Sequence, residues 1–184
     1  MLEEAGKVLE KEGHHNVTAV VHDMTSLPFV AGSFDLILCN MGYFEESQKA
    51  AHEAFRVLRR GGGIATATWG PLTRHQEWHL LRATRRAAGV HIRGRWVPTT
   101  GQAKRRLATA GFVDIATLEE TFENRFETTT AYVTYRKSFP SSAIKSRLRA
   151  GYFEALLKEA ERRSDADGSL TVRWAVTFIT ATCR

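Results

Sequence analysis

Two polar side chains follow apolar segments of this chain and are well placed for chemistry. Asp23 comes shortly after the β-branched run 17–21, and Asn40 comes directly after the apolar run 34–39. Ligands of open parallel sheets bind beyond the carboxyl ends of the strands, where both side chains would lie. A carboxylate there can distinguish an amino donor from a keto oxygen. Asp23 could equally cap the turn at Thr25 and Ser26, and the residues alone leave both interpretations open.

The loop after the second run reads Asn40-Met41-Gly42-Tyr43-Phe44. Gly42 would let the backbone approach a ligand closely. Asn40 and Tyr43 could orient a ligand by hydrogen bonds. The alternative is that the loop places its aromatic rings over the core, and both interpretations stay open.

Three tryptophans are candidates for the wall of a binding pocket: Trp69, Trp78 and Trp96. Aromatic walls suit a flat or apolar ligand, and they also attract a cation. Core packing is the alternative for each of them. Candidate bases are His75, His79 and His91, but nothing in the sequence selects one, so no catalytic residue is assigned.

These residues need strands and helices to position them, and hydrophobic periodicity predicts an alternation of the two. The apolar patterns predict strands over 17–21, 34–39, 64–69, 112–122 and 170–180. They predict helices over 1–12, 47–60, 74–88, 99–110 and 141–163, with 128–139 unassigned. Glycines 61–63 are expected to end the helix over 47–60. The expected fold class is α/β, with a mostly parallel sheet covered by helices.

Length and composition limit the classes of protein. The 184 residues, 43% hydrophobic and 25% charged, fit one globular domain over 1–184. No apolar run approaches the roughly 20 residues of a membrane span, and no secretory signal is seen, which predicts a cytoplasmic protein. The two cysteines and seven histidines suggest neither a disulfide framework nor a metal site. Net charge of +6 alone does not indicate nucleic-acid binding, because no aromatic and basic motif accompanies it.

Taken together, the segment 17–69 resembles the class I S-adenosylmethionine-dependent methyltransferases, in particular the small-molecule type-11 group. The resemblance rests on Asp23 after a strand, Leu27-Pro28-Phe29, Ser33-Phe34-Asp35 opening the next strand, and Glu53-x-x-Arg56-Val57-Leu58-x-x-Gly61-Gly62. Arg60 departs from the proline usual in the family. Glu53 and Arg56 are expected to pair with each other or with nearby backbone, and Asp35 is expected to have a structural role.

The resemblance implies a Rossmann-like sheet of seven strands in the order 3-2-1-4-5-7-6, with S-adenosylmethionine as cofactor. Asp23 and the backbone of Met24 would contact adenine, and Asn40, Met41 and Gly42 would line the methionine end of the cofactor. The small-molecule acceptor would touch residues of the loop and the aromatic walls, namely Tyr43, Phe44, Trp69, Trp78 and Trp96. Residues 128–165 would form an insertion or lid before the last strand.

The chain begins too late to contain two features of the family. These are the glycine-rich turn after the first strand and the acidic end of the second strand. We therefore expect an N-terminally truncated chain with strands 3 to 7, an incomplete cofactor site and an unpaired apolar sheet edge. The expected function is methyl transfer in the full-length family. The alternative is a non-catalytic module that dimerises or binds a partner through the exposed edge.

Overall fold

The computed structural model describes residues 2–42, 47–90, 99–138 and 149–184. The helices are α1 (Leu2–Lys11), α2 (Gln48–Val57), α3 (Gln76–Ala87), α4 (Thr100–Ala110), α5 (Thr129–Ser138) and α6 (Arg149–Glu161), with a short 3-10 helix η2 (Leu72–Arg74). The strands are β1 (Phe34–Asn40), β2 (Leu58–Trp69), β3 (Phe112–Phe126) and β4 (Leu170–Cys183).

The four strands form one mixed sheet in the order β1-β2-β4-β3. β1 and β2 run parallel, with Leu38 opposite Ala65, whereas β4 runs antiparallel to both β2 and β3. This arrangement corresponds to the 4-5-7-6 part of the expected strand order. The predicted α/β class is confirmed. The sheet is mixed and not mostly parallel, because one of its three strand pairs is parallel and two are antiparallel.

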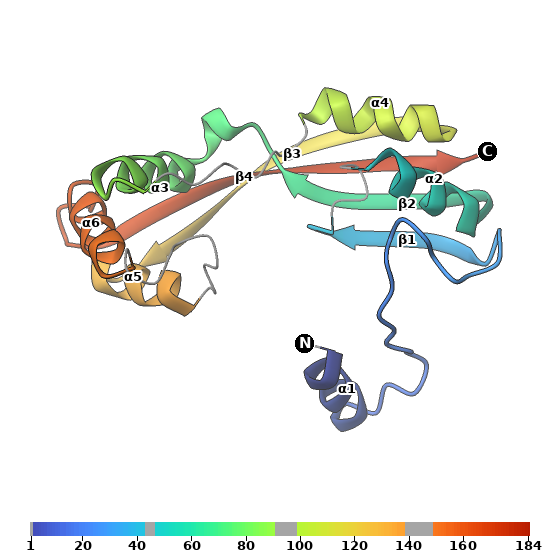
Figure 1. The fold of residues 1–184 in the computed structure, drawn as a ribbon, viewed down its shortest axis with the longest axis horizontal. Helices are drawn as coiled ribbons and strands as arrows, with labels where there is room; N and C mark the ends of the chain where they lie inside the picture. The colour runs from blue at the N-terminus through green and yellow to red at the C-terminus, as the bar shows by residue number, and fades with distance from the viewer. Residues whose placement is uncertain (1, 43–46, 91–98, 139–148) are drawn as a thin grey trace.

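One face of the sheet is covered by α2 and α4, which lie along the same side in Figure 1. Small and branched side chains from the two helices and from β2 and β4 form the first hydrophobic core. Its members include Ala54, Leu107, Ile64 and Ile179, which are at most 1% exposed. Because strand residues alternate between faces, the side chains next to these point to the opposite side of the sheet.

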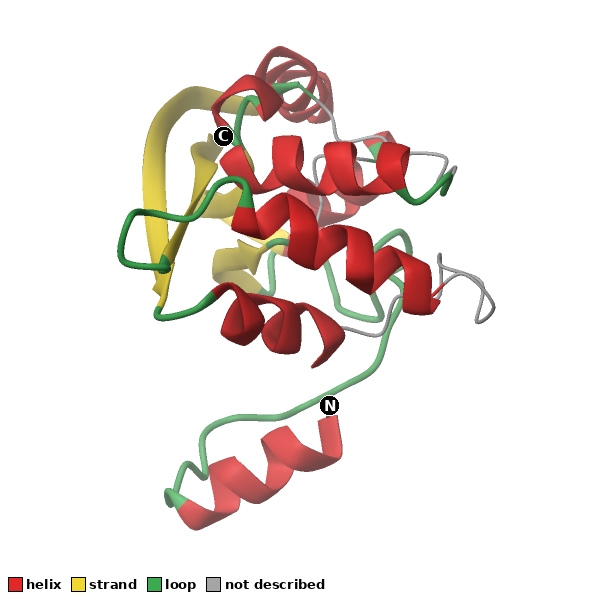
Figure 2. Cartoon of the chain, turned by 90° about the vertical axis from the view of Figure 1, so that its left-hand side faces the viewer, coloured by secondary structure: helices red, strands yellow, loops and turns green. Residues whose placement is uncertain are grey.

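A second core lies at the far end of the long β3/β4 ribbon. The ribbon continues past β1 and β2, and α3, α5 and α6 gather around its end (Figures 1 and 2). This core includes Leu80, Tyr132, Leu156 and Leu170, all 1% exposed or less. The unassigned segment 128–139 contributes α5, and the helix predicted over 141–163 is α6 within the described residues.

The sheet face opposite α2 and α4 carries exposed apolar side chains. Leu36 and Leu38 of β1 are 54% and 74% exposed, and Leu118 and Phe122 of β3 are 57% and 46% exposed. Exposed apolar patches of this kind usually mark a binding surface. We call this surface the open face.

The strand predicted over 17–21 is wrong. These residues are irregular and exposed, with Val21 at 77% exposure, and α1 stands apart from the sheet at the end of the extended segment (Figure 1). A strand needs a neighbour for its backbone hydrogen bonds, and in the described chain the segment has none. The β-branched composition of the segment indicates a propensity for strand, but it does not supply a strand to pair with. We call residues 2–21 the N-terminal arm.

The prediction that glycines 61–63 end a helix is also wrong. α2 ends at Val57, and β2 begins at Leu58 and runs through all three glycines. A β-carbon on Gly62 would lie 2.9 Å from the carbonyl oxygens of Arg59 and Asp35. The glycine therefore permits close approach of two backbones within the sheet.

Candidate functional site

The loop after β1 is held against the end of β2. The Met41 amide donates to the Ala67 carbonyl oxygen at 2.9 Å, so pairing continues one residue beyond the strand. Met41 has φ of +53°, a conformation that costs energy for a side chain with a β-carbon. A β-carbon on Gly42 would lie 2.6 Å from the Cys39 sulfur, so a side chain there would require that sulfur to move. Strain and close packing thus fix the backbone of Asn40, Met41 and Gly42.

Asn40 and Met41 border a groove of about 510 Å³ on the open face. The floor is made of small side chains such as Ala65 and Ala67. Its apolar walls include Leu38, Val176, and the edge-to-face pair Phe122 and Phe178, whose ring centroids are 6.3 Å apart. The volume suits a small organic ligand. Two of the predicted cofactor residues therefore share one apolar groove.

The end of β2 contains Trp69 and a buried histidine. The Gly70 amide donates to the Ala175 carbonyl oxygen at 2.9 Å, and the half-buried Trp69 ring meets the His75 ring edge-on with centroids 5.4 Å apart. His75 Nε2 lies 3.3 Å from the Gly70 carbonyl oxygen, and burial lowers the pKa of the imidazole. The imidazole is held at the strand end and packs against Trp69.

Asp23 and Met24 lie in the exposed segment before β1, and neither lines the groove. The Asp23 carboxylate accepts the Thr25 backbone N–H at 2.8 Å, and this bond lowers the pKa of the carboxyl. The capping interpretation of Asp23 therefore describes what the side chain does in this structure. The adenine contact stays a prediction.

Trp78 is half-buried on α3 and does not line the groove, and the guanidinium carbon of Arg85 lies 5.5 Å from its ring centroid. Tyr43, Phe44, Trp96 and His91 lie outside the described residues.

Glu77 is a buried charge centre that sequence reasoning missed. The side chain of Glu77 accepts hydrogen bonds from Tyr132 Oη at 3.1 Å, from Arg136 Nη1 at 3.2 Å, and from Trp174 Nε1. Together with burial, the nearby carboxylate raises the pKa of Tyr132. The available signal was an acidic residue on the same helical face as Leu80 and Leu81. This carboxylate ties α3, α5 and β4 together.

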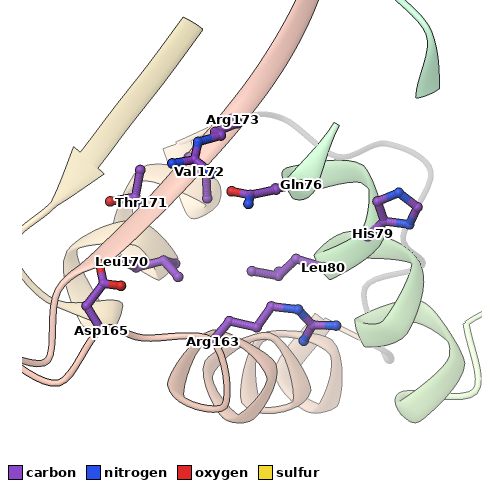
Figure 3. A pocket seen from close by; sticks show the side chains of 9 residues that line it. All are labelled: Gln76, His79, Leu80, Arg163, Asp165, Leu170, Thr171, Val172 and Arg173. Carbon is purple, nitrogen blue, oxygen red and sulfur yellow. The ribbon is translucent and has the colours of Figure 1, made fainter. Parts of the chain in front are cut away.

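A second pocket, of about 430 Å³, lies between α3, α6 and the start of β4 (Figure 3). His79 and Gln76 line it beside two arginines. Both arginines are already paired with carboxylates, Arg163 with Glu159 and Arg173 with Glu123. The pocket is therefore close to charge balance and has no strong preference for an anion.

The residues of the remaining motif are structural. Arg56 Nη2 lies 2.8 Å from Glu53 Oε2, and Arg56 also donates to the carbonyl oxygens of Leu27 at 2.9 Å and Phe29 at 2.7 Å. Because Arg56 and the Leu27 N–H both donate to it, the pKa of Glu53 falls to about 2. Asp35 pairs with Arg59 at the start of β1. The predicted pairing of Glu53 with Arg56 is confirmed.

The described residues fit the methionine end of S-adenosylmethionine in part. Asn40 offers an exposed amide beside the groove, and the backbone at Gly42 carries no side chain. The fit to the adenine ring is poorer, because the Asp23 carboxylate already accepts the Thr25 backbone N–H. Within the described part of the chain, no group of three or more His, Cys, Asp or Glu is arranged to hold a metal ion. None of the described helices has the length and apolar character needed to cross a bilayer.

Comparisons with known proteins find methyltransferases among the proteins similar to this chain. The methyltransferase domain family matches residues 1–62. Over 75 residues the chain is 36% identical to the mitochondrial 2-methoxy-6-polyprenyl-1,4-benzoquinol methylase of Leishmania donovani, covering 40% of this chain and 26% of that protein. Over 107 residues it is 32% identical to the malonyl-[acyl-carrier protein] O-methyltransferase of Methylococcus capsulatus, covering 57% of this chain and 38% of that protein.

The chain thus spans only about a quarter to two fifths of the length of these curated relatives. In structure it is similar over its whole length to the YcgJ protein of Bacillus subtilis, with a TM-score of 0.62, 17% identity and 78% of that chain covered. The first 62 residues are thus similar to a methyltransferase domain, and the chain as a whole shares the fold of the YcgJ protein.

Proposed function

We propose that this chain takes part in S-adenosylmethionine-dependent methyl transfer to a small-molecule acceptor. The observation that carries the proposal is the strained Asn40-Met41-Gly42 loop at the carboxyl end of β1, which opens onto an apolar groove. When bound, the cofactor supplies a methyl group on a positively charged sulfur. The chain has to hold that sulfur, position the acceptor and exclude water.

Each task has a candidate in the described residues. The Asn40 amide orients the methionine end of the cofactor. Gly42 has no side chain, so the cofactor can approach the loop backbone closely. The apolar groove beside Leu38, Phe122 and Phe178 receives the acceptor. Segment 128–165, which contains α5 and α6, is proposed as the lid. No base is assigned, because transfer from a sulfonium can proceed by proximity and in-line orientation.

Calorimetric titration of the full chain with S-adenosylhomocysteine tests the proposal. Saturable binding that weakens in Asn40→Ala supports it. Absence of binding at millimolar ligand rules out autonomous catalysis by this chain.

We propose a second function on a separate observation, the unpaired outer edge of β1. Within the described residues β1 pairs only with β2, and its Leu36 and Leu38 are exposed beside that edge. Such an edge can accept a strand from another chain. The second candidate is therefore a dimerisation or partner-binding module, tested by the concentration dependence of the sedimentation coefficient.

A further inference from the structure

The open face and the outer edge of β1 form one continuous surface with no covering layer in the described chain. A sheet normally buries both of its apolar faces or exposes a polar one. Here Leu36, Leu38, Leu118 and Phe122 remain exposed beside a strand whose outer backbone groups have no strand partner among the described residues. The surface therefore needs both a strand and an apolar element.

The N-terminal arm has the two matching features. α1 is amphipathic, with Ala5, Val8 and Leu9 on one side, and Val8 is 50% exposed. The run 17–21 is β-branched, with Val17, Val20 and Val21 between 50% and 77% exposed. An amphipathic helix and an extended β-branched run are the elements that a bare sheet face and a bare edge accept.

Charge also favours contact between the arm and the rest of the molecule. Residues 2–21 contain four acidic and two basic side chains, whereas residues 22–184 contain 16 acidic and 24 basic side chains. The acidic segment is thus attracted to the basic body, which speeds and orients docking.

The root of the arm directs it away from its own sheet. Arg56 holds the carbonyl oxygens of Leu27 and Phe29, Glu53 accepts the Leu27 N–H at 2.8 Å, and the Thr25 turn follows Asp23. From this anchored root the segment extends beyond the β1 side of the sheet, and α1 stands clear of the body (Figure 1). An arm that projects from one copy while an identical receptor surface stays bare is the geometry of exchange between protomers.

We infer that the N-terminal arm of one copy docks on the β1 edge and open face of a second copy, in a reciprocal dimer. Residues 17–21 add a strand to the partner's edge, and the apolar side of α1 covers the neighbouring exposed leucines. The inference rests on the second proposed function, edge pairing, and names its occupant. A docked arm covers Leu38 and so competes with an acceptor for the groove.

Analytical ultracentrifugation of the full chain and its variants tests this inference. The wild type is expected to dimerise reversibly with rising concentration. Val8→Glu in the arm and Leu38→Glu on the face each raise the dimer dissociation constant by about tenfold or more, since each buries a charge without a partner. Gly6→Glu adds the same charge to α1 away from its apolar side, where nothing lies within 4 Å of a β-carbon, and it leaves the dimer intact.

Mixing the two disruptive variants separates exchange in trans from docking within one chain. Val8→Glu retains an intact face and Leu38→Glu retains an intact arm, so their mixture recovers one of the two contacts and dimerises more strongly than either variant alone. A mixture that stays as monomeric as its components overturns exchange. Circular dichroism confirms that Leu38→Glu, at a position 74% exposed, remains folded.

The failures of the two proposals differ. If the dimer is lost in Leu38→Glu but unchanged in Val8→Glu, docking of the arm is refuted and edge pairing is retained. If the wild type stays monomeric up to roughly millimolar concentration, which is the weak limit of specific association, both edge pairing and docking of the arm are refuted.

Discussion

Replacing Glu77 by glutamine should destabilise the lobe built on α3, α5 and α6. The Glu77 carboxylate is buried and accepts from the Tyr132 hydroxyl, the Arg136 guanidinium and the Trp174 indole N–H. The amide keeps one acceptor oxygen, but its NH2 group can no longer accept from one of these donors. Arg136, whose side chain is 25% exposed, also loses its anionic partner.

The expected loss follows from those contacts. A hydrogen bond to a charged group contributes about 1.5–3 kcal/mol, and breaking a buried ion pair costs about 3–5 kcal/mol. One acceptor oxygen remains and Arg136 can reach water, so we expect a loss of about 2–4 kcal/mol in the free energy of unfolding. For a chain of this size that lowers Tm by roughly 4–16 °C.

Urea unfolding followed by tryptophan fluorescence and by circular dichroism measures this change. The matched control is Glu154→Gln on α6, where an exposed carboxylate pairs with Lys158 at 2.8 Å. An exposed pair of this kind contributes about 0.2–1 kcal/mol. If Glu77→Gln destabilises the chain no more than Glu154→Gln, the role of Glu77 as the tie between α3, α5 and β4 is refuted.

Two further predictions concern stability. Gly111→Ala should lower the free energy of unfolding by about 1–3 kcal/mol, because Gly111 has φ of +109° and a β-carbon there would lie 2.8 Å from the Phe55 ring. The control Gly151→Ala, in α6, should raise the free energy of unfolding by about 0.5–1 kcal/mol. Thermal unfolding measures both, and equal effects would contradict the packing argument. The pKa of Glu53 is about 2 against an ordinary 4.5, so its ionised form stabilises the fold above pH 4.5 and this contribution disappears as pH falls toward 2. The protection factor of the Leu27 amide, which compares its exchange rate with the intrinsic rate at the same pH, should therefore fall over that range in wild type. In Glu53→Gln it should change little with pH, and a fall like that of wild type would argue against this role.

Elements set by local pattern could be predicted from the sequence. The helix over 99–110 has a Thr99 cap with Gln102 and ends at Gly111, so both boundaries are encoded within a few residues. The β1 strand and the site loop that follows it were predicted by the same means, because the apolar run ends at Asn40. The structure places Asn40 and Met41 on one groove without testing their role.

Elements that depend on distant partners could not be predicted. The run 17–21 has strand composition but no neighbour in the described chain, so propensity alone gave the wrong structure. The glycines at 61–63 lie in β2 because β1 and β4 flank them, a fact that local turn chemistry does not contain. Glu77 depends on donors contributed by α5 and β4, 55 or more residues away.

The Asn40 loop is proposed to hold the methionine end of S-adenosylmethionine, and calorimetric titration with S-adenosylhomocysteine tests this role most directly. We predict saturable binding that weakens about tenfold in Asn40→Ala, the loss of one hydrogen bond to a charged group. Asn124→Ala, on β3 away from the groove lining, should leave the affinity unchanged. Absence of binding at millimolar ligand, or equal affinity in wild type and Asn40→Ala, would contradict the claim.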